Sequence, residues 1–268
     1  MSTNIEMRSG AFAWRRIHSL TGVWLVIFLI EHLIVNSQAT LWIGDDGIGF
    51  VRLVNLLETI PFLPIIESVF LGIPIVVHGY WGVRRAFQAK SNSFKSDGSE
   101  PELKYGRSKA FTWQRLTSWI LLVGIIGHVV QMRFVQMPEK IDDGFEAKYM
   151  VEVTDDSGLQ SIAERVGVKL LYKDDSIQVT AKTPGKAMLM MMRDTFKNPL
   201  MCVLYTIFVL AAAFHAFNGV WTALITWGVM LSVRSQKRML SICWLGVLLL
   251  AFLGLVSIWG SYWVNLRN

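Results

Sequence analysis

The sequence predicts an all-α integral membrane protein, a bundle of five transmembrane helices with a small α/β insertion in one outer loop. Of the 268 residues, 53% are hydrophobic and only 17% are charged, and the mean hydropathy is positive, at +0.41. The 11 Trp and 15 Phe are also unusual for a soluble domain of this length. Finally, five apolar segments are each long enough to cross a hydrocarbon core, which takes about 20 residues.

These segments define the expected organisation of the chain. We place the five spans near residues 19–42, 64–86, 113–136, 199–222 and 239–264. The chain then divides into three parts, namely a membrane part at 1–137 with a cytoplasmic loop at 87–112, an extracytoplasmic insertion at 138–197, and a second membrane part at 198–268.

Basic residues are unevenly distributed between the short loops. They gather before the first span, between the second and third, and before the fifth, whereas the loop at 43–63 has only Arg52 against three acidic residues. The positive-inside rule therefore predicts a cytoplasmic N-terminus and, with five spans, an extracytoplasmic C-terminus. Topology also accounts for the net charge of +6 better than a nucleic-acid partner does.

The insertion at 138–197 is polar, unlike the rest of the chain. Its pattern predicts a strand at 149–154, a short helix at 159–166, a strand at 176–180 and a helix at 186–196. We expect a small α/β cap on the outer face.

A weak internal duplication relates the first span to the third. His18-Ser-Leu-Thr-Gly is followed fourteen residues later by His32, and Gln114-Arg-Leu-Thr-Ser is followed fourteen residues later by His128. The second and fourth spans share a different motif, H-x-x-x-G-V, which begins at His78 and again at His215. Each of these four spans therefore carries one matched histidine.

The depth of each histidine predicts which of them can meet. At 1.5 Å per residue, His32 and His128 both lie about 20 Å from the inner boundary. His78 lies about 9 Å from that boundary, and His215 about 24 Å below the outer one, which gives a similar inner depth. We therefore expect an outer pair, His32 with His128, and an inner pair, His78 with His215.

Paired imidazoles on facing helices suit a haem with two axial histidines. Such a site has no open iron position for oxygen or substrate and favours one-electron transfer. Two sites at different depths would form a relay across the membrane. Gly82 and Gly219, four residues after His78 and His215, would let a flat macrocycle approach the helix closely.

Other polar residues near these faces have two interpretations each. His18, Ser19, Gln114 and Arg85 could reach haem propionates or a bound ligand, or they could serve as interfacial residues and topology anchors. Glu67 could accept a proton in a quinone site near the outer haem, or it could be a solvated carboxylate at a helix end.

Several motifs together resemble a known family. They are Arg15-Arg-Ile-His18-Ser-Leu-Thr-Gly…Glu31-His32-Leu, Leu57-Glu-Thr-Ile-Pro-Phe, Val77-His78-Gly, Gln114-Arg-Leu-Thr…His128-Val and Phe214-His215-Ala-Phe-Asn-Gly. The chain resembles the cytochrome b membrane-anchor subunits of succinate dehydrogenase and fumarate reductase, in particular the single-chain, five-helix, two-haem type. The resemblance covers nearly the whole chain except 138–197.

The resemblance implies a cofactor, partners and a location. His32, His128, His78 and His215 would ligate two haem b groups. A flavoprotein and an iron–sulfur subunit would dock on the cytoplasmic face of a bacterial inner membrane, and succinate would be oxidised there. Electrons would then pass through both haems to a membrane quinone, usually menaquinone in similar proteins.

Two other functions remain open from the residues. One is a dihaem cytochrome b of another respiratory complex, of the hydrogenase or formate dehydrogenase type, although those proteins differ in ligand spacing. The other is a histidine-containing transporter without haem.

Overall fold

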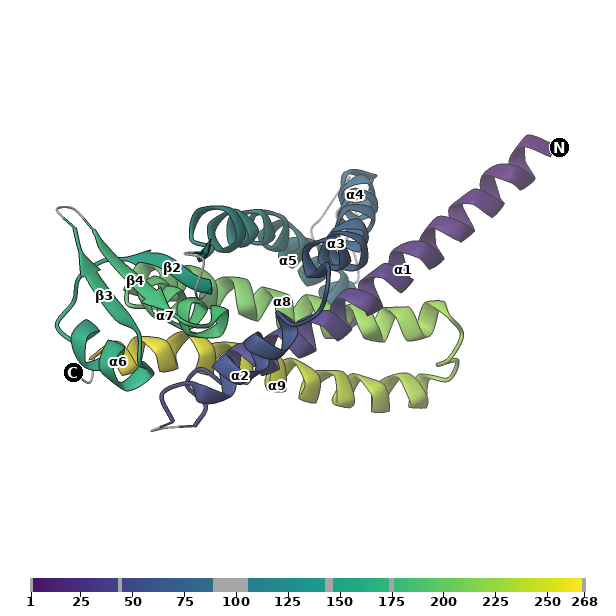
Figure 1. The fold of residues 1–268 in the computed structure, drawn as a ribbon. Helices are drawn as coiled ribbons and strands as arrows, with labels where there is room; N and C mark the ends of the chain where they lie inside the picture. The colour runs from purple at the N-terminus through teal and green to yellow at the C-terminus, as the bar shows by residue number, and fades with distance from the viewer. Residues whose placement is uncertain (1, 43–44, 89–105, 143–146, 174–175, 267–268) are drawn as a thin grey trace. The chain divides into compact units, whose positions relative to one another are not determined.

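The computed structural model describes residues 2–42, 45–88, 106–142, 147–173 and 176–266 (Figure 1). Within these residues, five helical segments are long and apolar enough to cross a membrane, which confirms the predicted class of fold. They are α1 (Ser2–Ser37); α3 (Leu63–Glu67), η1 (Ser68–Gly72) and α4 (Ile73–Gln88) in succession; α5 (Gly106–Val129) with η2 (Val130–Val135); α8 (Pro199–Thr226); and α9 (Val233–Leu266).

The spans differ from their predicted bounds mainly at the ends. The first helix ends at Ser37, five residues earlier than predicted, and turns follow it. The last begins at Val233 instead of 239, because the Ser232 hydroxyl accepts a hydrogen bond from the backbone N–H of Ser235 and caps the helix. Most of the predicted cytoplasmic loop at 87–112 lies outside the described residues.

Two spans contain a π-helical turn. In the second span, η1 lies between Glu67 and the helix that carries His78, and in the third span η2 begins two residues after His128. Each wide turn rotates the residues that follow it relative to a regular helix. The hydropathy of a span does not reveal such a turn, because the turn changes the backbone hydrogen bonds and leaves the composition unaltered.

The segment at 43–63, expected to be an outer loop, contains the helix α2 (Ile48–Leu57). Its Phe50, Val51 and Val54 are buried and form one cluster with residues of α7 (Pro184–Phe196). Asn55 Oδ1 also accepts a hydrogen bond of 2.9 Å from the backbone N–H of Gly185, at the start of α7. The helix is therefore stabilised by a partner distant in the sequence.

The insertion forms a small α/β structure, as predicted. In its described part, four strands make an antiparallel sheet in the order β1-β2-β4-β3, namely β1 (Glu139–Asp142), β2 (Ala147–Val153), β3 (Lys169–Tyr172) and β4 (Ile177–Ala181). The helix α6 (Leu159–Val166) has the predicted bounds. The two edge strands β1 and β3 were not expected, because their residues are mostly exposed and lack the alternation of a half-buried strand.

Two compact units make up the chain. One comprises Met1–Ile30, Pro64–Val123 and Leu210–Leu250, and the other comprises Glu31–Leu63, Gly124–Val209 and Ala251–Asn268. The first, called here the 78/215 unit, contains His78 and His215. The second, the 32/128 unit, contains His32, His128 and the insertion.

Candidate functional site

In the 78/215 unit, His78 of α4 faces His215 of α8. Their ring centroids lie 6.3 Å apart, and the ring planes are inclined by 79°. His78 Nδ1 lies 3.0 Å from the backbone carbonyl oxygen of His18. Because a carbonyl oxygen only accepts hydrogen bonds, this contact assigns the ring proton of His78 to Nδ1 and leaves the lone pair on Nε2.

His215 is oriented in a comparable way by a hydroxyl group. Its Nδ1 lies 3.2 Å from Thr117 Oγ1, and that hydroxyl is within 2.8 Å of the backbone carbonyl oxygen of Trp113. The hydroxyl donates its proton to the carbonyl and therefore accepts from Nδ1–H of His215. Here, too, Nε2 is the nitrogen with the available lone pair.

In the 32/128 unit, His32 of α1 faces His128 of α5. Their ring centroids lie 5.9 Å apart at an angle of 81°. His128 Nδ1 lies 3.3 Å from the Tyr205 hydroxyl, which donates in turn to Gln131 Oε1 at 3.0 Å. His128 therefore also has its proton on Nδ1 and its lone pair on Nε2.

These separations fit two axial ligands of one iron. An imidazole nitrogen lies about 2 Å from a bound metal ion, so two rings on opposite sides of an iron have centres roughly 6 Å apart. Hydrogen bonding of the second ring nitrogen is typical of histidines that ligate metals. Among the described residues, no cluster of three or more His, Cys, Asp or Glu side chains is placed to hold a metal ion. Each pair offers two imidazoles, the number of axial ligands in a haem with two histidines.

His18 lies beside the 78/215 pair in a different geometry. Its ring is stacked on His78 with centroids 4.1 Å apart and planes inclined by only 11°. That spacing is too short to hold an iron between the rings. The Nδ1 of His18 is buried, with no hydrogen-bond partner among the described residues. The observed contacts of His18 are therefore the stack and its backbone carbonyl, both of which orient His78.

The other predicted polar residues of this unit have protein partners. Gln114 Nε2 donates to the backbone carbonyl oxygen of His215 at 3.1 Å. Ser19 Oγ accepts from Trp227 Nε1 at 3.1 Å, and the Arg85 guanidinium lies 5.9 Å from the centre of the Trp81 ring. Contacts of these residues with haem propionates remain predictions.

Gly82 and Gly219 lie opposite residues of the neighbouring helices. A Cβ atom at Gly82 would lie 3.8 Å from the His18 ring, and one at Gly219 would lie 3.7 Å from Gln114. The two repeats thus place equivalent residues opposite each other, His18 against Gly82 and Gln114 against Gly219. Both spacings are ordinary van der Waals contacts, so the role of these glycines beside a macrocycle remains a prediction.

Sequence reasoning missed three residues of the sites. A Cβ atom at Gly22 would lie 2.7 Å from Cε1 of His78, so only glycine leaves room for that ring. Thr117 and Tyr205 hold His215 and His128 through Nδ1. Gly22 and Thr117 belong to the repeated motifs and could have been inferred from them, whereas nothing in the pattern distinguishes Tyr205.

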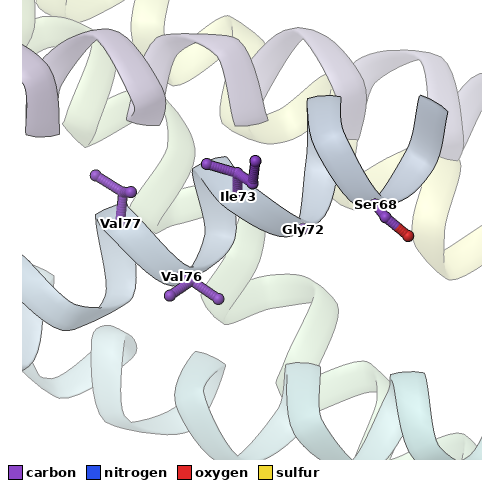
Figure 2. A pocket seen from close by; sticks show the side chains of 5 residues that line it. All are labelled: Ser68, Gly72, Ile73, Val76 and Val77. Atoms are coloured by element: carbon purple, nitrogen blue, oxygen red, sulfur yellow. The ribbon is translucent and has the colours of Figure 1, made fainter. Parts of the chain in front are cut away.

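A pocket lies on η1 and α4. Glu67, the last residue of α3, comes just before it in the sequence. The pocket has a volume of about 360 Å³ and is lined by Ser68, Gly72, Ile73, Val76 and Val77. Figure 2 shows Ile73 and Val77 on one side of the helix and Ser68 and Val76 on the other. With a single hydroxyl among these side chains, the pocket suits a mainly apolar occupant.

No protein-family model matches the chain. The chain is similar over almost its full length to one curated protein, the succinate dehydrogenase cytochrome b558 subunit of Bacillus subtilis (strain 168). The two are 27% identical over 248 residues, which cover 92% of this chain and 95% of that protein. The predicted resemblance to the cytochrome b membrane-anchor subunits of succinate dehydrogenase is therefore confirmed.

Proposed function

We propose that this chain, a membrane anchor of the succinate dehydrogenase cytochrome b type, binds two haem b groups and passes electrons from an iron–sulfur subunit to a membrane quinone. His78 and His215 would hold one haem, and His32 and His128 the other. Each haem would supply one-electron redox chemistry, with both axial positions filled by histidine. In this proposal the chain conducts electrons, and succinate is oxidised in a partner.

One observation carries this proposal. In three of the four histidines, Nδ1 makes a hydrogen bond that leaves the Nε2 lone pair available, and each ring faces another histidine at a distance suited to a shared iron. A histidine that only joins two helices would use its ring nitrogens for that bond and would need no second histidine opposite. The spacing therefore favours ligand pairs over a haem-free transporter.

The partners and the orientation follow from the family likeness and the loop charges. A flavoprotein and an iron–sulfur subunit would dock on the cytoplasmic face of a bacterial inner membrane. The N-terminus would lie on that side and the C-terminus outside. The 78/215 pair would receive electrons first and the 32/128 pair second.

The pocket on η1 and α4 supports a quinone site on the second span. A quinone has a polar ring and a long apolar chain, and here Glu67 is the residue before Ser68, which lines a mainly apolar pocket. Glu67 would exchange protons with the quinone, menaquinone in similar proteins.

Replacing Glu67 by Gln should slow quinone reduction at least tenfold, as expected for loss of a general acid–base group. Unchanged turnover in that variant, at full haem content, would rule out this role for Glu67.

Optical spectroscopy tests the haem assignment. The purified protein should contain two haem b groups per chain by pyridine haemochrome, with a b-type α-band in the reduced-minus-oxidised spectrum. Replacing His78 or His215 by Ala should remove one spectral component and preserve the other, whereas His32→Ala or His128→Ala should do the reverse. A chain without haem would refute the proposal, and loss of both components in every variant would refute independent sites.

A further inference from the structure

A chain of hydrogen bonds in the 32/128 unit connects His128 to the insertion. It begins where His128 Nδ1 meets the Tyr205 hydroxyl at 3.3 Å, and that hydroxyl donates to Gln131 Oε1 at 3.0 Å. Gln131 Nε2 then donates to Gln136 Oε1 at 3.1 Å. The same Gln136 oxygen accepts from the Thr195 hydroxyl at 3.0 Å. Thr195 belongs to α7, the last helix of the insertion.

The direction of each donor is determined along this chain. Tyr205 uses its one proton toward Gln131, so its oxygen can only accept from His128. Gln131 accepts on its carbonyl oxygen and donates onward from its amide nitrogen. Hydrogen bonds aligned in this way polarise one another, and the effect is larger where the local dielectric constant is low. The bonds from His128 through Tyr205 and Gln131 to Gln136 therefore draw the Nδ1 proton away from the His128 ring. Thr195 donates to the same Gln136 oxygen and competes with Gln131 for it.

Residues of the insertion also hold Tyr205 in place. Phe196, directly after Thr195, packs edge-on against the Tyr205 ring with centroids 5.1 Å apart. Phe196 is only 4% exposed, and Tyr205 is half-buried. Tyr205 therefore depends on α7 for its packing and, through Gln136, for the end of its hydrogen-bond chain.

In the 78/215 unit, the described Nδ1 partners of the histidines are of a different kind. His78 Nδ1 donates to a backbone carbonyl oxygen, and His215 Nδ1 donates to a threonine whose own proton goes to the backbone. Those partners belong to the membrane helices themselves.

We propose that Tyr205 is a positioning residue that strengthens His128 as an electron donor, and that the insertion modulates this effect through Thr195, which competes with Gln131 for the Gln136 oxygen. The inference rests on the proposed function, in which His128 ligates a haem. A histidine whose Nδ1 proton is drawn away is a more basic ligand. More basic ligation favours oxidised iron, so the chain lowers the potential of the haem at this pair. The insertion thus sets one potential and leaves the other unaffected.

Redox titration of the purified two-haem protein tests this inference. In Tyr205→Phe, the component that His32→Ala removes should become easier to reduce, by about tenfold in its reduction equilibrium, or about 59 mV for one electron. The component that His78→Ala removes should keep its potential. Tyr262→Phe is the matched control, because Tyr262 packs against the same unit but lies outside the hydrogen-bond chain, and it should leave both potentials unchanged.

A second variant distinguishes an effect on the reduction potential from a simple loss of structure. Thr195→Val keeps the size of the side chain but removes the hydroxyl that competes with Gln131 for the Gln136 oxygen, three hydrogen bonds from Tyr205. It should lower the same potential, by less than Tyr205→Phe raises it. If both variants retain two haems and wild-type potentials, the inference is overturned. If Tyr205→Phe loses a haem, the titration of Thr195→Val is the test. An unchanged potential in that variant overturns the inference. Absence of haem from the wild-type protein would instead refute the proposed function.

Discussion

At the scale of single residues, the sites depend on the hydrogen-bond partners of the histidines as much as on the histidines themselves. Three rings are oriented through Nδ1, by the carbonyl oxygen of His18, by Thr117 and by Tyr205. These bonds select the tautomer that presents Nε2 to the facing ring. Without these Nδ1 partners the same helices would hold the imidazoles less firmly.

Gly22 provides a test at this scale. Gly22→Ala would place a methyl group 2.7 Å from the His78 ring, which is shorter than any tolerable contact, so the ring must move. Overpacking of this kind costs about 1–3 kcal/mol. We expect the spectral component that depends on His78 to weaken or shift, as seen in the reduced-minus-oxidised spectrum.

Gly79→Ala is the control for this variant. Gly79 lies next to His78 on the same helix, but an added Cβ there would meet no atom within 4 Å. That variant should keep the wild-type spectrum. Equal spectra in both variants would contradict the proposed dependence of His78 on space at Gly22.

At the scale of elements, an ion cluster ties α7 to the loop before α6. Arg193 is nearly buried, and its Nη1 and Nη2 donate to the two carboxylate oxygens of Asp156, the longer of these bonds being 2.9 Å. Lys197 lies 3.2 Å from the same carboxylate. Burial alone would raise the pKa of Asp156, but the hydrogen bonds and charges of Arg193 and Lys197 outweigh it and lower that pKa below its ordinary value.

This lowered pKa predicts how the insertion responds to acid. A carboxyl group whose pKa is lower in the folded state stabilises the fold above the ordinary aspartate range, and the stabilisation is lost as the pH falls through the folded value. Hydrogen exchange of α7, corrected for the intrinsic effect of pH, should therefore show weaker protection in acid. Asp156→Asn should cost about 3 kcal/mol at neutral pH, because Arg193 loses its paired charge, and should reduce the dependence on pH.

The neighbouring Asp155 supplies the matched control, since its side chain is exposed. Asp155→Asn should retain wild-type protection and the wild-type response to acid. If Asp156→Asn responds to pH as the wild type does, the cluster is not the source of that response.

At the scale of the whole molecule, the proposed orientation in the membrane can be checked with single cysteines. Both native cysteines, Cys202 and Cys243, are buried, so they should react little with a polar thiol reagent. Leu231, 83% exposed, lies between the fourth and fifth spans, and the exposed Thr59 precedes the second span. In sealed cells, Thr59→Cys should be labelled by an impermeant reagent and Leu231→Cys should not. The opposite pattern would reverse the topology and place the catalytic partners on the other face.

Local patterns in the sequence were sufficient to predict much of this structure. The number of spans follows from the length of each apolar run, and α6 has the predicted bounds because its amphipathic pattern is strong over a short distance. The histidine pairing followed from a constant rise per residue, which converts position in the sequence into depth. Two errors, the helix α2 and the edge strands β1 and β3, concern elements that depend on neighbours far along the chain.

What the sequence alone determined is therefore the set of spans and the pairs of histidines that the structure brings face to face. Only the tertiary structure decided which nitrogen is available in the rings of His78, His215 and His128, and which residues keep it so. The partners of Nδ1 are 60 residues away for His78, 98 for His215 and 77 for His128. Spacing along one helix carries no information about contacts between helices so far apart. The folded bundle alone brings Tyr205, and through it the insertion, to the side of His128.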